Sequence, residues 1–299
     1  MMNKNLLLVL LLLLAVPPGV VAAEAKVEAI DFVCSAHRAF FDFVGKDGHQ
    51  VVAYYDASRQ MSVAHRESNR PWRFQKLPSY LGWDSHNYVV IGIDEAGYIH
   101  VSGNMHNDSL VYFRSEKPFD VRSLRQVATM VGGDEEEKAT YPHFFNGPDG
   151  RLYFKHRYGS SGDGVELYKV FDTETLRWQQ LHQTAFVDGE GERNGYFAGP
   201  KLEQDGRFHL AWVWRETPSA NTNHDLSYAR SRDLLNWETS DGEPLSLPIR
   251  LATAEIVDDV QIGGGLLNGH SPIALDSKNQ PMVAYQKYGR NGQSQVYLS

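Results

Sequence analysis

The chain has 299 residues, with 37 acidic and 29 basic side chains and a formal net charge of −8. A net negative charge argues against nucleic-acid binding and against a polybasic patch that binds membranes. We therefore expect neither nucleic acid nor a membrane as a partner. The negative charge is compatible with a polyanionic ligand, because a protein with an acidic surface can still have a binding site lined by cationic side chains. Cys34 is the single cysteine, which excludes an intramolecular disulfide and leaves stability to the apolar core.

The first residues have the pattern of an export signal. A short positive start at Lys4 precedes an apolar run over residues 6–16, and small residues follow at 21–25. This pattern is typical of a secretory signal peptide, and the run is too short for a transmembrane helix. We expect residues 1–25 to be a signal peptide, and the protein to be secreted into the periplasm or the extracellular medium.

A strand–turn–strand unit, usually with Gly in the turn, recurs through the rest of the chain. In chain order the units occupy residues 50–65, 88–101, 144–154, 197–213 and 273–285. Short strands in units of about 50 residues are typical of a β-propeller. A β-sandwich or jelly roll would also show alternating strands, but it would not predict matched polar positions at this spacing. We therefore predict an all-β fold, a β-propeller of about five blades, over residues 26–299.

The ends of the units refine this prediction. Trp72, Trp178 and Trp237 close three units and are expected in the blade cores, and the turns 172–174 and 231–233 resemble degenerate Asp boxes. The fifth unit ends with residues 295–298 and has neither a fourth strand nor a closing Trp. We therefore expect the propeller to be incomplete at its C-terminal end. The irregular residues 240–265 are expected to form an excursion between blades.

Two sets of polar residues occupy matched positions in the repeats. Just before each first strand lies a His or Tyr: His86, Tyr141, Tyr196 and His270. Late in each second strand lies a His, Arg or Lys: His106, Arg157, Arg215 and Lys287. In an antiparallel hairpin the start of one strand lies beside the end of the other, so both sets should converge at one mouth of the propeller. Imidazole, phenol and guanidinium groups gathered there predict an active site.

Five short motifs, spread over residues 53–298, resemble a known family. They are Trp-Asp-Ser-His-Asn at 83–87, Gly-Asn-Met-His-Asn at 103–107, Ala-Thr-Tyr-Pro-His-Phe at 139–144, Phe-Lys-His-Arg-Tyr-Gly at 154–159 and Asn-Thr-Asn-His-Asp-Leu at 221–226. In this order they resemble the BNR-repeat-like polysaccharide lyases, in particular the ulvan lyases, which are seven-bladed propellers. Such enzymes cut a sulfated polysaccharide of rhamnose 3-sulfate and uronic acids by β-elimination.

The resemblance implies roles for individual residues. His86 and His106 correspond to the family's pair of active-site histidines, and Tyr141 to its catalytic tyrosine. Arg157 corresponds to the arginine that neutralises the uronate carboxylate, and Tyr196 to a further tyrosine that contacts substrate. The family has seven blades, whereas this chain has about five.

The chemistry of β-elimination explains why such residues are needed. Removing the C5 proton of a uronate adds negative charge beside a carboxylate, and a bidentate guanidinium such as Arg157 can stabilise that charge. A neutral His is suited to the base role, and Tyr141 can protonate the leaving oxygen. We expect Tyr141 to be the acid, and also the base for one uronate epimer. Either His86 or His106 is expected to be the base, with the other orienting the sugar.

The remaining candidate residues line or surround this mouth. Arg215, His270 and Lys287 are expected to bind substrate, by contacting sulfate or by lining the channel, and Trp83 could stack on a sugar. The elimination requires no cofactor. His209 and His224 are candidates for a structural metal ion, although their spacing does not define a metal motif.

Two other functions fit parts of the pattern. A propeller glycoside hydrolase usually needs two carboxylates that flank the bond, or, in a sialidase, a Tyr nucleophile and an arginine triad. A non-catalytic sugar-binding propeller would keep aromatic and cationic contacts without a His–Tyr–Arg set. We expect the protein to be a monomer acting on an anionic polysaccharide.

Overall fold

The computed structural model describes residues 27–35, 41–269 and 271–299. The chain divides into two compact units, Met1–Ile30 and Asp31–Ser299, and every strand among the described residues lies in the second. The predicted signal peptide lies outside the described residues and stays a prediction. None of the helices described is long or apolar enough to cross a membrane.

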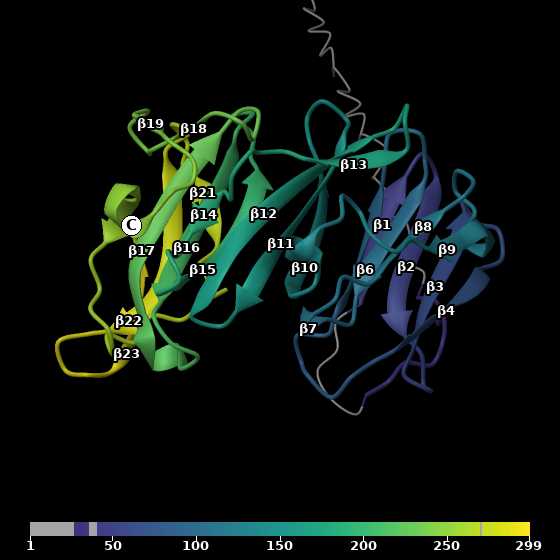
Figure 1. The fold of residues 1–299 in the computed structure, drawn as a ribbon, viewed down its shortest axis with the longest axis horizontal. Coiled ribbons are helices and arrows are strands. Elements are labelled where there is room, and N and C mark those ends of the chain that lie inside the picture. Colours follow the sequence, from purple (N-terminus) through teal and green to yellow (C-terminus); the bar gives the residue numbers. More distant parts are fainter. Residues whose placement is uncertain (1–26, 36–40, 270) are drawn as a thin grey trace, which may run out of the picture. The chain divides into compact units, whose positions relative to one another are not determined.

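Five antiparallel sheets make up Asp31–Ser299, as the repeats predicted (Figure 1). The first contains β1 (Asp42–Lys46), β2 (His49–Tyr55), β3 (Gln60–Glu67) and β4 (Arg73–Tyr80). The second contains β5 (Val89–Ile93), β6 (Ile99–Gly103), β8 (Tyr112–Ser115) and β9 (Leu124–Gln126). Each predicted strand–turn–strand unit is an antiparallel pair within one sheet, so the all-β propeller fold is confirmed.

The third and fourth sheets are longer and carry extra edge strands. The third contains β10 (Ala139–Asn146), β11 (Leu152–Ser160), β12 (Asp163–Asp172) and β13 (Arg177–Gln180), with β7 (His106–Asp108) beside β10 and β14 (Val187–Asp188) beside β12. The fourth contains β15 (Asn194–Leu202), β16 (Phe208–Arg215), β17 (Asn223–Ser231), β18 (Trp237–Glu238) and β19 (Pro244–Leu245), with β20 (Glu255–Asp258) beside β17. The predicted excursion at residues 240–265 is therefore partly ordered, because β19 and β20 join the fourth sheet.

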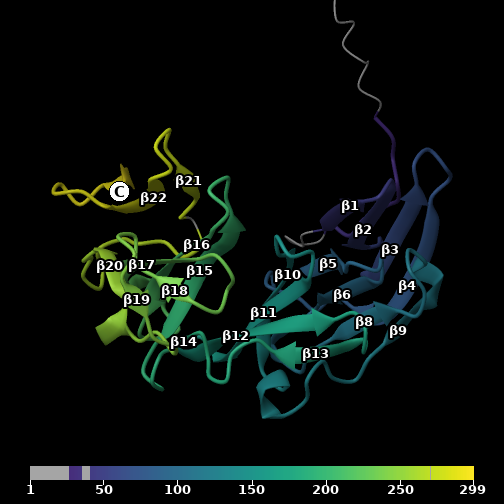
Figure 2. The ribbon, with the colours of Figure 1, turned by 90° about the horizontal axis from the view of Figure 1, so that it is seen from above.

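The fifth sheet has three strands, β21 (Ile273–Leu275), β22 (Pro281–Tyr288) and β23 (Ser294–Leu298). As expected from the sequence, it has no fourth strand among the described residues. Figure 2 shows the five sheets following one another in chain order.

Four buried apolar clusters hold successive sheets together. One lies between the first and second sheets, one between the second and third, one between the third and fourth, and one between the fourth and fifth. Trp178 and Trp237 are buried in the second and third of these clusters, as predicted for blade cores. The prediction is wrong for Trp72, which is only partly buried and belongs to none of the four clusters. Burial of such large aromatic side chains contributes roughly 1.5–3 kcal/mol each to stability. Packing of this kind fixes the relative positions of neighbouring sheets, and therefore of the polar residues at their ends.

Candidate functional site

A single carboxylate joins the two predicted histidines. His86 lies just before β5, and His106 begins β7. The Nδ1 atom of His86 lies 2.5 Å from one oxygen of Asp84, and the Nδ1 atom of His106 lies 2.7 Å from the other. The two imidazole rings are 4.3 Å apart at their centres, so Asp84 holds both rings side by side.

This bridge determines how each imidazole is oriented. A carboxylate can only accept hydrogen bonds, so each Nδ1 donates to Asp84, and in a neutral imidazole the lone pair is then on Nε2. Partial burial acts to raise the pKa of Asp84. The backbone N–H of His86 and the rings of His106 and His86 outweigh this effect and hold that pKa well below its usual range. Asp84 therefore stays ionised and keeps both histidines in the tautomer that presents Nε2 as a base.

Tyr141 lies at an irregularity in β10. The register between β10 and β11 shifts between Thr140 and His143, and Tyr141 has a φ of 58°, in the left-handed region that non-glycine residues rarely occupy. Such bulges re-aim a side chain, and they are common beside active sites. Here the ring of Tyr141 lies 5.7 Å from the ring of His86 in an edge-to-face arrangement.

The surroundings of Tyr141 keep its phenol protonated. Burial raises the pKa of Tyr141 above its ordinary value, and the charges of Arg157 and Arg215 offset only part of that increase. The phenol is therefore neutral at physiological pH and can donate a proton.

Arg157 lies beside Tyr141, across the β10–β11 pair. Its side chain is only 1% exposed, and its guanidinium carbon lies 5.0 Å from the ring centre of Tyr141. Its Nη2 donates to Thr140 Oγ1 and its Nε to the carbonyl of Gly159, whereas the buried Nη1 has no hydrogen-bond partner among the described residues. Burying a donor without a partner is costly, so this free edge of the guanidinium is a candidate contact for a ligand.

Tyr196 and Arg215 form a second tyrosine–arginine pair, in the fourth sheet. The guanidinium carbon of Arg215 lies 3.9 Å from the ring centre of Tyr196, and the ring of Tyr196 lies 6.1 Å from that of Tyr141. The hydroxyl of Ser161, in the β11–β12 turn, lies 2.5 Å from the phenol oxygen of Tyr196. Six of the predicted residues, His86, His106, Tyr141, Arg157, Tyr196 and Arg215, are therefore linked by a continuous series of contacts.

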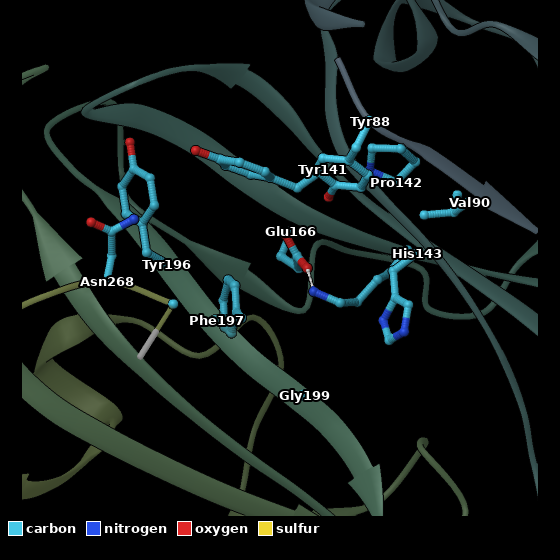
Figure 3. Close-up of a pocket in the computed structure, with 13 residues that line it drawn as sticks. Tyr88, Val90, Tyr141, Pro142, His143, Glu166, Tyr196, Phe197, Gly199 and Asn268 are labelled. Atoms are coloured by element: carbon cyan, nitrogen blue, oxygen red, sulfur yellow. Dashed lines mark hydrogen bonds and ion pairs between the residues drawn. The ribbon is translucent and has the colours of Figure 1, made fainter. Parts of the chain in front are cut away.

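A pocket of about 320 Å³ opens beside these residues, and Figure 3 shows Tyr141 reaching toward Tyr196 across it. Its lining comes from β5, β10, β11, β12, β15 and the loop at Asn268. Lys155 and Glu166 line the pocket and form a buried ion pair, with 2.6 Å between Nζ and Oε1. Burial, with the nearby charge of Lys155, lowers the pKa of His143 to about 4, so this imidazole is a neutral part of the lining at physiological pH.

Three other predicted residues have different surroundings. Trp83 is 69% exposed, with the guanidinium of Arg59 at 4.2 Å from its ring centre. Lys287 forms an ion pair with Asp258 in the region of the fourth and fifth sheets, and in the described part of the chain no hydrogen bond, ion pair or cation–π contact joins it to the six linked residues. His270 lies outside the described residues.

The two predicted metal-site histidines are each engaged by protein groups. The imidazole of His209 contacts Asp205 and Tyr228, and the second sheet repeats this Asp–His–Tyr arrangement with His100, Asp94 and Tyr112. The nitrogens of His224 face Glu216 and Asp225. Among the described residues, the group whose donor atoms could by type and proximity hold a metal ion is Asp84, His86 and His106, with all three atoms within 4.8 Å.

Sequence reasoning missed several residues that organise this site. Asp84 was seen only as a carboxylate near the mouth and was given no role, although it lies two residues before His86 in the Trp-Asp-Ser-His-Asn motif. Ser161 lies in a turn, and Asn268 in an irregular segment with no repeat partner, so neither carried a periodic signal. Thr140 precedes Tyr141, and its hydroxyl accepts from both Arg157 and the backbone N–H of Asn107.

Comparisons with known proteins place the chain among related sequences. The model of a family described as "BNR repeat-containing family member" matches residues 49–299. The chain is 22% identical over 282 residues to an ulvan lyase of Alteromonas sp. (strain LOR), which covers 81% of this chain and 56% of the relative. It is 22% identical over 142 residues to a short isoform of ulvan lyase from the same organism, covering 44% of this chain and 26% of that relative. The chain thus spans only part of the length of these curated relatives.

Solved structures show the same fold. The polysaccharide lyase Uly1 superimposes with a TM-score of 0.72 at 15% identity, over 93% of this chain and 76% of that one. A PL25 ulvan lyase bound to -[GlcA(1-4)Rha3S]- superimposes with a TM-score of 0.65 at 16% identity, over 90% and 69%. Because the family match extends over most of the chain, and because these folds agree with it, the protein belongs to the BNR repeat-containing family.

Proposed function

We propose that this protein is a secreted polysaccharide lyase that cleaves a sulfated, uronate-containing polysaccharide of the ulvan type by β-elimination. The similarity to proteins named ulvan lyases supports the reaction class and the substrate class. The single observation that carries the proposal is that Tyr141 contacts both His86 and Arg157, because this arrangement supplies a base, an acid and a cation at one place.

Arg157 takes the role of the electrostatic stabiliser. Its unpartnered Nη1 offers hydrogen-bond donors to a uronate carboxylate, which gains negative charge as the C5 proton leaves. The guanidinium is fixed in advance by Thr140 and Gly159, so little reorganisation is needed in the transition state.

The histidines and Tyr141 carry out the proton transfers. A histidine held by Asp84 takes the C5 proton at Nε2, and the neutral phenol of Tyr141 gives a proton to the leaving glycosidic oxygen. The bond from C5 to hydrogen and the bond from C4 to oxygen break, and a C4–C5 double bond forms, so the step is redox-neutral. Tyr141 remains the candidate base for the other uronate epimer.

The geometry gives less support to the two alternative functions, a glycoside hydrolase and a sugar-binding propeller. A hydrolase of the usual type needs two carboxylates that flank the scissile bond, whereas Asp84 is occupied by two histidines and Glu166 by Lys155. A sugar-binding propeller does not need the His–Asp–His bridge. Secretion, a monomeric state and a reaction without a cofactor are further parts of the proposal.

The test is to incubate the purified protein with ulvan and to analyse the new chain ends. The lyase proposal expects unsaturated uronate at the non-reducing end. Saturated ends would indicate a hydrolase, and binding without new ends would indicate a sugar-binding protein.

A further inference from the structure

Asp84, His86 and His106 supply two imidazoles and one carboxylate, which is a ligand set that zinc prefers. One ligand atom from each residue lies within 4.8 Å of the other two. Zinc binds imidazole nitrogen and carboxylate oxygen at about 2.0–2.2 Å, and three such ligands leave a fourth position for water. Ligand atoms of a tetrahedral zinc ion are then about 3.4 Å apart. The distances from Asp84 to the two rings, 2.5 and 2.7 Å, need to widen by less than about 1 Å to admit the ion.

The backbone holds these three side chains in place. The N–H of His86 donates to Oδ1 of Asp84 at 2.8 Å, and His106 lies opposite Thr140 in the β7–β10 pair. Groups that orient the ligands in this way raise the affinity of a metal site. The side chains of Asp84, His86 and His106 are 42%, 41% and 27% exposed, so an ion can enter from solvent and keep a bound water.

A second close pair of histidines lacks the carboxylate. Nδ1 of His49 lies 2.9 Å from Nε2 of His65, and no carboxylate in the described part of the chain forms a hydrogen bond or ion pair with either ring. Two imidazoles alone are an incomplete zinc site, since such sites use three or four protein ligands. The pair of His49 and His65 is therefore a matched comparison for the Asp–His–His group.

A metal ion bound by Asp84, His86 and His106 changes what the two imidazoles can do. In the metal-free protein each Nδ1 carries a proton and donates to Asp84, which leaves the lone pair on Nε2. A metal ion takes the lone pair of a neutral imidazole nitrogen, so binding at Nδ1 moves the ring proton to Nε2. No proton is gained or lost in this exchange. A protonated Nε2 has no lone pair and cannot accept the C5 proton of a uronate.

We propose that Asp84, His86 and His106 bind one Zn²⁺ ion, and that the bound ion inhibits elimination by placing a proton on Nε2 of both histidines. The effect on elimination rests on the proposed function, whereas binding and the change of tautomer do not. Mg²⁺ prefers oxygen ligands and usually keeps several waters, so it neither occupies this site nor inhibits.

The first test measures binding alone. Protein without a polyhistidine tag is freed of metal with a chelator and titrated with Zn²⁺ by calorimetry, and we expect tight binding of one ion per chain. His106→Gln should weaken this binding by at least about 100-fold, because losing a ligand exceeds the roughly 10- to 100-fold effect of losing an outer partner. His49→Gln removes one imidazole from the comparison pair and should bind like the wild-type protein. Circular dichroism establishes that all the proteins are folded.

The second test reads the proton and the reaction separately. NMR of the ring nitrogens should show Nε2 of His86 and His106 protonated in the Zn²⁺-loaded protein and unprotonated in the metal-free protein. Loaded wild-type and His49→Gln proteins, freed of excess ion, should make unsaturated product from ulvan far more slowly than their metal-free forms. A chelator should restore the rate, and treatment with Mg²⁺ should leave it unchanged.

The inference is overturned if Zn²⁺ does not bind, if His106→Gln binds it like the wild-type protein, or if Nε2 stays unprotonated in the loaded protein. It is also overturned if loaded protein eliminates as fast as metal-free protein, or faster. Zn²⁺ binding that needs His106 and shifts the tautomer, in a protein that makes no unsaturated product even when metal-free, would support the metal site and reject the lyase.

Discussion

The guanidinium carbon of Arg157 lies 5.0 Å from the ring centre of Tyr141, and the two residues come from adjacent strands, β10 and β11. The bulge that gives Tyr141 its φ of 58° turns the phenol toward His86 while Arg157 stays in regular register with Thr140. One local irregularity therefore places an acid between a cation and an imidazole.

Arg157→Lys should lower kcat/KM on ulvan by about 10²–10³-fold, the usual effect of removing a preorganised group that faces developing charge. Lysine keeps the positive charge but loses the planar fork that binds a carboxylate bidentately. Initial rates of unsaturated-product formation measure the effect. Arg230→Lys provides a matched control, and equal activity of Arg157→Lys and the control would refute the carboxylate role.

Asp84→Asn should lower kcat on the order of 10²–10⁴-fold, since the two imidazoles face different oxygens of Asp84 and one of these would become an NH2 group, which cannot accept a hydrogen bond. At least one histidine would then lose the tautomer that presents Nε2. NMR of the histidine ring nitrogens should show a changed tautomer population, which a merely structural role would not require. Asp108→Asn removes an exposed carboxylate nearby and is the control. If Asp84→Asn retained the wild-type rate and tautomers, the bridge would have no part in the reaction.

Tyr141→Phe should strongly slow elimination while preserving the fold, because it removes one oxygen and keeps the ring packing. The loss should be about 10²–10⁴-fold in kcat, as expected for a general acid. Binding of ulvan oligosaccharides should persist, as titration calorimetry can show. Full turnover by this variant would exclude Tyr141 as the acid.

Stability should fall between neutral and mildly acidic pH because of His156. Burial, with the nearby charge of Lys169, lowers the pKa of His156 from 6.5 to about 3 in the folded protein. The unfolded chain therefore binds a proton first, so the stability contributed by neutral His156 is complete above pH 6.5 and is lost as the pH falls toward 3. At pH 5 the loss should be roughly 2 kcal/mol from this residue.

Urea unfolding at pH 7 and pH 5 checks this expectation. The His156→Gln protein has no such proton to gain, so its free energy of unfolding should change less between the two pH values. Equal pH dependence in the wild-type and variant proteins would show that His156 is not responsible.

The sequence was most informative where strands are buried and paired. The units that became β5–β6, β10–β11, β15–β16 and β21–β22 were predicted because a turn signal separates two apolar segments. The edge strands β1 and β4 were not predicted, because partly exposed edge strands have weaker apolar patterning. Two of the five residues of β1 and five of the eight residues of β4 are indeed exposed.

The site was predicted in part for a similar reason. Arg157 and Arg215 lie late in β11 and β16, as the repeats predicted, and antiparallel pairing brings them beside the starts of β10 and β15. His106 instead lies beyond the end of β6, in β7, which pairs with β10 of the third sheet. Asp84 and Asn268 act across sheet boundaries, and contacts of that kind depend on how blades pack rather than on spacing along the chain. The Asp–His–Tyr networks of His100 and His209 are a repeat that the sequence contained but that was not recognised, because its members lie on different strands.

The most direct test of the account is the ultraviolet absorbance of a conjugated alkene during incubation of wild-type and Tyr141→Phe proteins with ulvan. The account predicts a rising signal with the wild-type protein and a far slower rise with folded Tyr141→Phe. New reducing ends formed by the wild-type protein without any alkene absorbance would contradict it.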